Sequence, residues 1–419
     1  MEKFIISGGR KIAGRVDLQS AKNSILPLIA ASIIKNGKTR IKRCPKINDV
    51  LIMCEIIKSL GGSYYFENDT LCLDTANVSS WILPSNLTSE IRASLFIVGA
   101  LICRFGYASI RMPGGCNIGD RPIDIHIDGL RALGVNVVEG EANVFYGQNL
   151  TAREITLRFP SVGATENLMM ASLRAKGVTV IKNCAKEPEI VDLQKYLNML
   201  GAKIMGAGSD VITIEGGTIT PCEEVEILPT ADRIELGTLL YAVASVGGEL
   251  EIDLNGIKKS FVKNEIFKNN ACKISIINDN IYYIGFFRPI VGFGKITTGP
   301  YPEFPTDLQP QLVACSCIAK GITAIEERVF PQRFAYVEQL KLFGAKVGVY
   351  DNLCLVEGGK LHGAKVTAGD LRGGASLIIG AISAEGESEI RNVSHVDRGY
   401  YKLEEKLSSL GVKIKRERY

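Results

Sequence analysis

Apolar and polar positions follow one order repeatedly along this chain. A strongly apolar stretch of helical length, such as SILPLIAASII or ASLIIGAISA, leads to a glycine and a short apolar strand. An amphipathic helix and a two-stranded hairpin come next. Because a helix that is apolar on nearly all sides must be enclosed, we expect these stretches to be buried helices surrounded by sheets and outer helices.

This order occurs six times, and one position marks each copy. The residue that closes the amphipathic helix is glycine in five copies, which suits a helix end because glycine takes the left-handed conformation freely. The six positions are Gly61, Gly134, Gly201, Ala271, Gly344 and Gly411. Copies one and four, two and five, and three and six are each 210 residues apart. The sequence therefore predicts an α/β protein with two similar domains of three repeated units each, a pseudo-sixfold internal repeat.

Polar and charged side chains gather at the start of the apolar helices. They are Lys22 and Asn23, Arg92, Ser161, Asp232 and Arg233, Thr306 and Asp307, and Asp370 and Arg372. The first N–H groups of a helix lack partners within it and the helix dipole is positive there, so such ends attract anions. These ends suit a strongly anionic ligand, although caps and ion pairs are the plainer alternative. We expect Ser20 to cap the first helix.

Composition narrows the class of protein. The 419 residues carry a net charge of +4, too balanced to indicate nucleic acid or a membrane surface as a partner. The N-terminus has no signal-peptide pattern, and the apolar run 93–103 is too short to cross a bilayer. The eleven cysteines are an odd number in a long chain without a secretory signal, so we expect reduced thiols in the cytoplasm. With three histidines and no CxxC pair, no metal site is expected, and Cys315 and Cys317 are assigned to core packing.

One cysteine has an unusual context. Cys116 follows a Pro-Gly-Gly turn and precedes Arg121 by five residues in RMPGGCNIGDRP. Most cysteines are buried and inert. A glycine-rich loop, however, is able to carry a thiol over a ligand, and a neighbouring cation makes a thiol more reactive.

Eight ordered motifs bear on these alternatives. They are SAKNS, RAS at 92–94, PGGCNIGDRPIDIHI, PSVGAT, EPEIVDL, FPTDLQPQ, DLRGGASL and HVDRGY. With them the chain resembles the UDP-N-acetylglucosamine 1-carboxyvinyltransferases, enolpyruvyl transferases of the EPSP synthase-like superfamily. The resemblance implies two inside-out α/β barrels. It also implies that residues 1–21 and 232–419 form one discontinuous domain, and that 22–231 form the domain with the cysteine loop.

The implied reaction opens peptidoglycan precursor synthesis. It moves the enolpyruvyl group of phosphoenolpyruvate to the 3-hydroxyl of UDP-N-acetylglucosamine, releases phosphate and needs no cofactor. Phosphoenolpyruvate carries a phosphate and a carboxylate, which forked cations bind well. The residues that match the family's phosphoenolpyruvate-binding positions are Lys22, Asn23, Arg121, Arg333, Arg372 and Arg398.

The same resemblance assigns the chemistry. Asp307 matches the general base for the sugar hydroxyl and Cys116 the proton donor, with Lys22 and Arg398 completing the catalytic set. Cys116 is also the expected target of fosfomycin-type alkylation. The matched UDP-sugar positions are Arg92, Arg121, Pro122, Ile123, Asp124, Ile125, Ser161, Val162, Gly163, Asp307 and Val329. Further candidates nearby are His126, Phe330, Glu187 and Glu189.

Some positions depart from the family pattern. They are Glu303 in YPEFPTD, Pro331 and Gln332 in PQRF, Asn117 and Asp120 in the cysteine loop, and the extra residues Thr230 and Ala231. They suggest a divergent or second-copy member.

Two alternatives stay open. A 3-phosphoshikimate 1-carboxyvinyltransferase should have GNAGT where this chain has LTSEIRASL. A non-catalytic paralogue that binds UDP-sugar should have lost Cys116, Asp307 or an arginine, and all are present. Partners are expected to be the two small substrates alone, with a monomer preferred.

Overall fold

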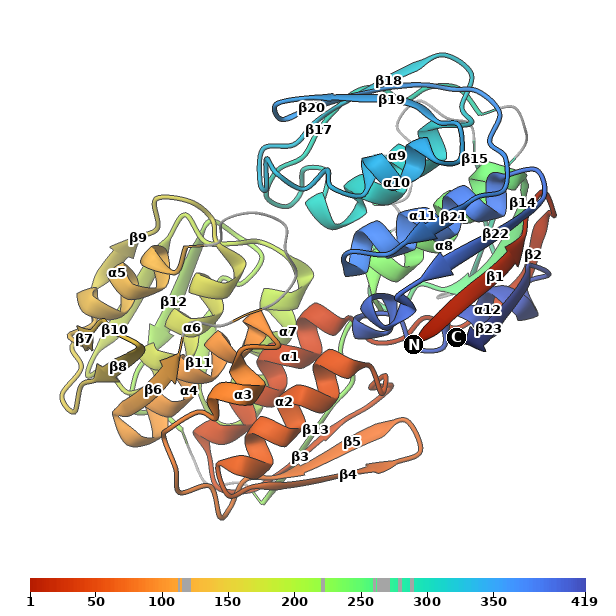
Figure 1. Ribbon diagram of the computed structural model, residues 1–419. Coiled ribbons are helices and arrows are strands. Elements are labelled where there is room, and N and C mark those ends of the chain that lie inside the picture. Colours follow the sequence, from red (N-terminus) through yellow and green to blue (C-terminus); the bar gives the residue numbers. More distant parts are fainter. Residues whose placement is uncertain are drawn as a thin grey trace. The chain divides into compact units, whose positions relative to one another are not determined.

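The computed structural model forms two compact units. It describes residues 1–111, 114, 122–219, 223–258, 261, 272–277, 281–286 and 290–419. Unit 1 contains Met1–Gln19 and Ala231–Tyr419, and unit 2 lies within residues 20–230 (Figure 1). The chain therefore passes from one unit to the other after Gln19 and again after Thr230.

Unit 2 is built around three helices that are mostly buried. These are α1 (Lys22–Ala31), α4 (Phe96–Phe105) and α6 (Val162–Ser172), and α4 contacts both of the others. Each leads to a strand: β3 (Lys38–Ile41), β6 (Tyr107–Arg111) and β10 (Val178–Lys182). Outside lie α2 (Asn48–Ser59), α5 (Asp124–Ala132) and α7 (Pro188–Met199), each apolar on one face.

Unit 1 repeats this plan. Its buried helices α8 (Arg233–Val246), α9 (Gln309–Ser316) and α11 (Leu371–Ser383) contact one another. They lead to β14 (Gly248–Asp253), β18 (Ile322–Glu326) and β22 (Glu387–Arg391). The outer helices are α10 (Val337–Lys341) and α12 (Leu403–Ser409). Short helical turns complete both units: η1 (Ser32–Ile34), α3 (Ser85–Thr88), η2 (Arg92–Leu95), η4 (Thr306–Leu308) and η5 (Val393–Arg398).

The expected hairpins are present. They are β4 (Ser63–Glu67) with β5 (Thr70–Asp74), β7 (Asn136–Val138) with β8 (Ala142–Tyr146), β11 (Lys203–Met205) with β12 (Val211–Glu215), β15 (Cys272–Ile276) with β16 (Ile281–Phe286), and β19 (Lys346–Tyr350) with β20 (Leu353–Glu357). In each, the second strand pairs antiparallel with the strand that follows the buried helix. The helix-closing glycines Gly61, Gly134, Gly201, Gly344 and Gly411 have φ between 82° and 107°, which confirms the left-handed ends, while Ala271 lies outside the described residues.

Three of the sheets gain a further strand that pairs in parallel with the strand after the buried helix, and the local pattern does not predict these strands. They are β9 (Glu154–Thr156) beside β10, β17 (Gly294–Thr297) beside β18, and β21 (Lys365–Thr367) beside β22. The remaining parallel strands are exchanged between the halves of the chain. β2 (Ile12–Val16) precedes α1 yet pairs with β14 of unit 1, and β13 (Glu224–Ile227) precedes α8 yet pairs with β3 of unit 2.

The sixth hairpin is closed by the start of the chain. β23 (Lys413–Arg418) pairs antiparallel with β1 (Glu2–Ser7), which in turn pairs with β22. Figure 1 shows β1, in red, beside the blue strands. In the described part of the chain, no helix is both long enough and apolar enough to cross a membrane.

The position of β1 predicts which half of the protein depends on it. Phe4, at the centre of β1, is fully buried, so Phe4→Ala should lower the free energy of unfolding by about 3–5 kcal/mol. Hydrogen exchange should speed up in β22 and β23 and stay unchanged in β9 to β12. Lys415→Ala, at an exposed position of β23, serves as control. Equal acceleration in both units would contradict the assignment of β1 to unit 1 alone.

Candidate active site

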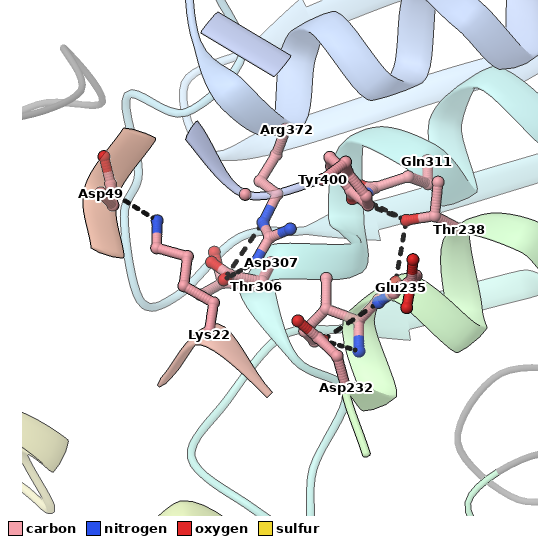
Figure 2. Close-up of polar contacts among 12 residues, drawn as sticks. Lys22, Asp49, Asp232, Glu235, Thr238, Thr306, Asp307, Gln311, Arg372 and Tyr400 are labelled. Atoms are coloured by element: carbon pink, nitrogen blue, oxygen red, sulfur yellow. Dashed lines mark hydrogen bonds and ion pairs between the residues drawn. The ribbon is translucent and has the colours of Figure 1, made fainter. Parts of the chain in front are cut away.

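In unit 1, one carboxylate is shared by two buried arginines. Arg333 Nη1 donates to Oδ1 of Asp307 over 2.8 Å. Arg372 Nη2 donates to Oδ2 of the same carboxylate over 2.9 Å (Figure 2). The arginine side chains are only 6% and 3% exposed, and that of Asp307 is 27% exposed. Nε of Arg333 and Nη1 of Arg372 are buried N–H groups without an acceptor among the described residues. Unused buried donors of this kind are costly unless an acceptor arrives.

The arginines also determine the protonation of Asp307. Burial alone would raise the pKa of its carboxyl, but the charges of Arg372 and Arg333, with their hydrogen bonds, hold that pKa well below its usual range. Asp307 is therefore ionised in this arrangement.

A second carboxylate holds the backbone around Asp307, and sequence reasoning missed it. Glu327 is fully buried. Its Oε2 accepts from the Thr306 hydroxyl at 2.9 Å, and its Oε1 accepts from the N–H groups of Val329 and Phe330 at 2.8 and 3.0 Å. Glu327 thus fixes η4, which carries Asp307, against the segment with the predicted residue Val329.

The start of α11 positions Arg372. The Asp370 side chain caps the helix by accepting from the N–H groups of Arg372 and Gly373 at 2.9 and 3.0 Å. The guanidinium of Arg372 lies 5.4 Å from the ring centroid of Tyr400, whose hydroxyl bonds to Thr238 at 2.8 Å (Figure 2). At the start of α11, the plainer alternative of caps and ion pairs is therefore present: Asp370 caps the helix and Arg372 pairs with Asp307. The same residues are the ones expected to attract an anion.

Arg398 is the last residue of η5, and its neighbours in sequence on both sides make hydrogen bonds that fix the backbone there. Before it, Asp397 accepts from two guanidinium nitrogens of Arg416 at 2.9 and 2.6 Å. After it, the buried Gln19 side chain donates to the carbonyl of Gly399 at 2.9 Å and accepts from the N–H of Tyr401 at 3.2 Å. Gln19 and Arg416 carry no motif signal, so sequence reasoning missed both.

In unit 2, Lys22 opens α1 and binds a carboxylate. Its Nζ lies 2.5 Å from Oδ2 of Asp49, in the first turn of α2, and both side chains are largely buried. Figure 2 labels this pair. The expected cap is wrong: Ala21 precedes the helix, and the Ser20 hydroxyl donates to the carbonyl of Lys42 at 3.2 Å instead. Asn23 follows Lys22 in the same turn, half-buried.

The predicted UDP-sugar residues of unit 2 fall into two neighbouring groups. Arg92 donates to the carbonyl of Pro122 at 3.3 Å, which joins η2 to the segment that contains Ile123. Asp124 and Ile125 begin α5, where Asp124 forms an ion pair with Arg158.

Ser161 caps α6 by accepting from the N–H of Ala164 at 3.3 Å. Val162 and Gly163 follow it in the first turn, and a Cβ on Gly163 would lie 3.1 Å from Cε1 of His126 in α5. The two groups therefore meet where α5 faces the start of α6.

Cys116 and Arg121 lie outside the described residues, as do Asn117 and Asp120. Gly114, two positions before Cys116, is described, and its N–H donates to the carbonyl of Thr88 at 3.0 Å. A Cβ on Gly114 would collide with the Ser89 carbonyl, so glycine is required there. No group of three potential metal-binding side chains occurs within the described ranges.

Comparison with known proteins decides the family. The family model described as EPSP synthase (3-phosphoshikimate 1-carboxyvinyltransferase) matches residues 6–407. The chain is 43% identical to UDP-N-acetylglucosamine 1-carboxyvinyltransferase 2 of Caldanaerobacter subterraneus subsp. tengcongensis, over 99% of this chain and 100% of the relative. It is 41% identical to UDP-N-acetylglucosamine 1-carboxyvinyltransferase 1 of Clostridium acetobutylicum, with the same coverage. The chain belongs to the UDP-N-acetylglucosamine 1-carboxyvinyltransferase family.

Solved structures agree on the fold. The enolpyruvyl transferase NikO from Streptomyces tendae superimposes with a TM-score of 0.88 at 24% identity, covering 99% of this chain and 98% of that one. EPSP synthase from Acinetobacter baumannii gives 0.76 at 18% identity, with both chains fully covered. These likenesses confirm the predicted fold class of two inside-out α/β barrels.

The hydrogen bonds of Thr230 and Glu303 show how two of the departures from the family pattern are held. The extra residue Thr230 donates to Asp192 of α7 through its N–H at 2.9 Å and its hydroxyl at 3.1 Å. Glu303 is exposed, and its N–H donates to the carbonyl of Pro300 at 2.9 Å. Nothing in the structure explains Pro331 and Gln332.

The charge shared at Asp307 predicts a pH-dependent effect on stability. Asp307→Asn should lower the free energy of unfolding by about 2–4 kcal/mol at pH 7, because two buried guanidinium groups lose their counter-charge. The folded pKa lies below the unfolded value of about 4. The loss should therefore stay constant above about pH 5 and shrink as the pH falls below about 4.

Urea unfolding followed by circular dichroism in phosphate-free buffers measures this difference. Asp351→Asn makes the same change in an exposed turn of unit 1 and should have little effect. A loss that stays constant down to pH 3 would contradict the pairing.

The Gln19 contacts predict a role for the segment that follows β2, where the chain passes from unit 1 to unit 2. Gln19→Leu removes both hydrogen bonds next to Arg398. It should lower kcat/KM for phosphoenolpyruvate by about ten- to a hundredfold, since displacing a binding group by about 1 Å is enough. Gln148→Leu, at an exposed bend of unit 2, is the matched control. Unchanged kinetics in a folded Gln19→Leu protein would show that Arg398 does not depend on Gln19.

Proposed function

We propose that this protein transfers the enolpyruvyl group of phosphoenolpyruvate to the 3-hydroxyl of UDP-N-acetylglucosamine and releases phosphate. The observation that carries the proposal is the pair of buried arginines on Asp307, which keep N–H groups without an acceptor among the described residues. Phosphoenolpyruvate offers phosphate and carboxylate oxygens as acceptors for such groups. The full-length relatives carry the name of this reaction.

The chemistry divides into addition and elimination. In the addition, Asp307 takes the proton of the sugar hydroxyl while that oxygen bonds to C2 of phosphoenolpyruvate. The methylene carbon C3 receives a proton, for which Cys116 is the proposed donor, and a tetrahedral ketal results. In the elimination, C3 loses a proton, the C2–O bond to phosphate breaks, and the enol ether of the sugar is left with free phosphate.

The environment of Asp307 explains how a weakly basic carboxylate can serve as the base. In the arrangement described, two guanidinium groups hold its pKa low. Phosphoenolpyruvate would compete for the same groups, because its phosphate and carboxylate suit their forked geometry. Each hydrogen bond and each share of positive charge moved from Asp307 to the substrate raises the basicity of Asp307. Substrate binding would thus activate the base.

Unit 2 would supply the nucleotide-sugar side. The capped first turn of α6 suits a diphosphate, and Arg92 beside Pro122 adds a positive charge. Lys22, paired with Asp49, would bind an anion at the start of α1. Arg121 and Arg398 complete the proposed set of cations.

Release of inorganic phosphate tests the proposal. Purified protein with phosphoenolpyruvate and UDP-N-acetylglucosamine should release phosphate, and Asp307→Asn and Cys116→Ala should each lower kcat by about 10²–10⁴-fold. Asp351→Asn should remain active. Release that requires shikimate 3-phosphate instead of the UDP-sugar would assign the protein to the other reaction of its superfamily. Tight UDP-sugar binding without any release would identify a non-catalytic paralogue.

A further inference from the structure

A buried amide in α6 joins three other elements of unit 2. Asn167 is fully buried. Its Oδ1 accepts from the N–H of Gly99 in α4 at 2.7 Å, and its Nδ2 donates to the carbonyl of Leu95 in η2 at 3.0 Å. The same Nδ2 lies 2.8 Å from Nδ1 of His126 in α5.

The two backbone partners fix the orientation of this amide. A backbone N–H only donates and a carbonyl only accepts, so exchanging Oδ1 and Nδ2 would break both hydrogen bonds of Asn167. Nδ2 therefore presents its second N–H to His126. Nδ1 of His126 must accept, and the proton of the neutral imidazole sits on Nε2.

The protonated edge of His126 lies at the first turn of α6. A Cβ on Gly163 would be 3.1 Å from Cε1 and 3.3 Å from Nε2 of the ring, so only glycine permits this approach without displacing the ring. Gly163 follows the cap residue Ser161 by two positions. Nε2–H is thus a hydrogen-bond donor next to the helix end that suits an anion.

We propose that Asn167 holds His126 as the neutral Nε2–H tautomer, and that His126 donates through Nε2 to an acceptor oxygen of the bound UDP-sugar. The ligand part rests on the proposed function. His126 is then a binding residue and Asn167 a positioning residue. With Nδ1 fixed as an acceptor, the neutral ring has its proton on Nε2, so Nε2 donates and does not accept.

Several charged groups lie on the described elements packed against His126. On α5, Asp124 and Asp128 both pair with Arg158, and Arg131 pairs with Glu139. On α6, Glu166 is fully buried, and burial raises its pKa well above the usual range, with the charges of Glu189 and Glu187 adding to the effect.

The other described elements of this region are η2 and β7. η2 contributes Arg92, which binds the Pro122 carbonyl. β7, which packs on α5, carries no charged residue. The amide of Asn167, rather than a carboxylate, faces Nδ1.

Nitrogen-15 NMR of histidine-labelled protein tests the tautomer without any activity. The chain has three histidines, so the His126 signals are assigned by their loss in His126→Gln. The wild-type protein should show a bare Nδ1 and a protonated Nε2 from pH 6 to pH 8. A proton on Nδ1 in this range would overturn the inference.

Asn167→Asp tests the positioning role. The new carboxylate would accept from Nδ1–H, so the imidazole would be doubly protonated at low pH and would have a bare Nε2 at high pH. UDP-N-acetylglucosamine affinity should then fall by about tenfold as the pH rises through this titration, while wild-type affinity stays level. Asn143→Asp makes the same change at another buried asparagine of unit 2 and should keep the wild-type pH profile.

The two readouts separate the hypotheses. The expected tautomer with level UDP-sugar affinity in Asn167→Asp would overturn the ligand contact of His126. Absence of UDP-sugar binding by wild-type protein, with the tautomer as expected, would overturn the proposed function. If Asn167→Asp fails to fold, the wild-type spectra still decide the tautomer, and a pH-dependent wild-type affinity with an imidazole titration would overturn the constant donor.

Discussion

Helices buried on all sides must still satisfy the N–H groups of their first turn, and this constraint organises both units. Side-chain oxygens of Ser161, Asp232 and Asp370 accept from these groups in α6, α8 and α11. Because each cap must reach into the interior, polar side chains collect where the apolar helices begin. Several residues proposed for binding or catalysis, such as Lys22, Asp307 and Arg372, come from these same turns. The proposed site and the packing of the helices therefore share positions.

Burial in the interior of unit 1 also requires that charged side chains be balanced by opposite charges. Arg333 and Arg372 cannot be buried without a counter-charge, and Asp307 provides it to both. The remaining N–H groups of the two arginines give the interior of unit 1 an affinity for anions that an ordinary ion pair lacks. The two arginines thus stabilise the ionised carboxylate of Asp307. In the proposed reaction, the substrate would have to relieve that stabilisation before Asp307 could act as a base.

Local pattern predicted the repeated helices, the hairpins and the helix-closing glycines because each depends on residues close together in sequence. It did not predict the parallel pairing of β2 with β14, since a strand's partner across more than 200 residues leaves no local trace.

Family motifs selected Asp307, Arg333 and Arg372, which the structure brings into contact. Gln19, Glu327 and Asn167 were missed because only the fold reveals which backbone groups their side chains meet. The Ser20 cap was wrong because the Lys42 carbonyl takes its hydroxyl, and the roles of Cys116 and Arg121 remain predictions.

The strands exchanged between the two halves of the chain bear on how the duplicated chain arose. β1 and β2 open the first half but belong to sheets of unit 1, and β12 and β13 open the second half but belong to sheets of unit 2. Two separate copies of one half, folded by the same pairing, would form a dimer in which each subunit lends its first two strands to the other. Fusing the genes of such a dimer end to end gives the present topology without rearranging any strand. The two crossings of the chain are then the arms of an ancient domain-swapped pair.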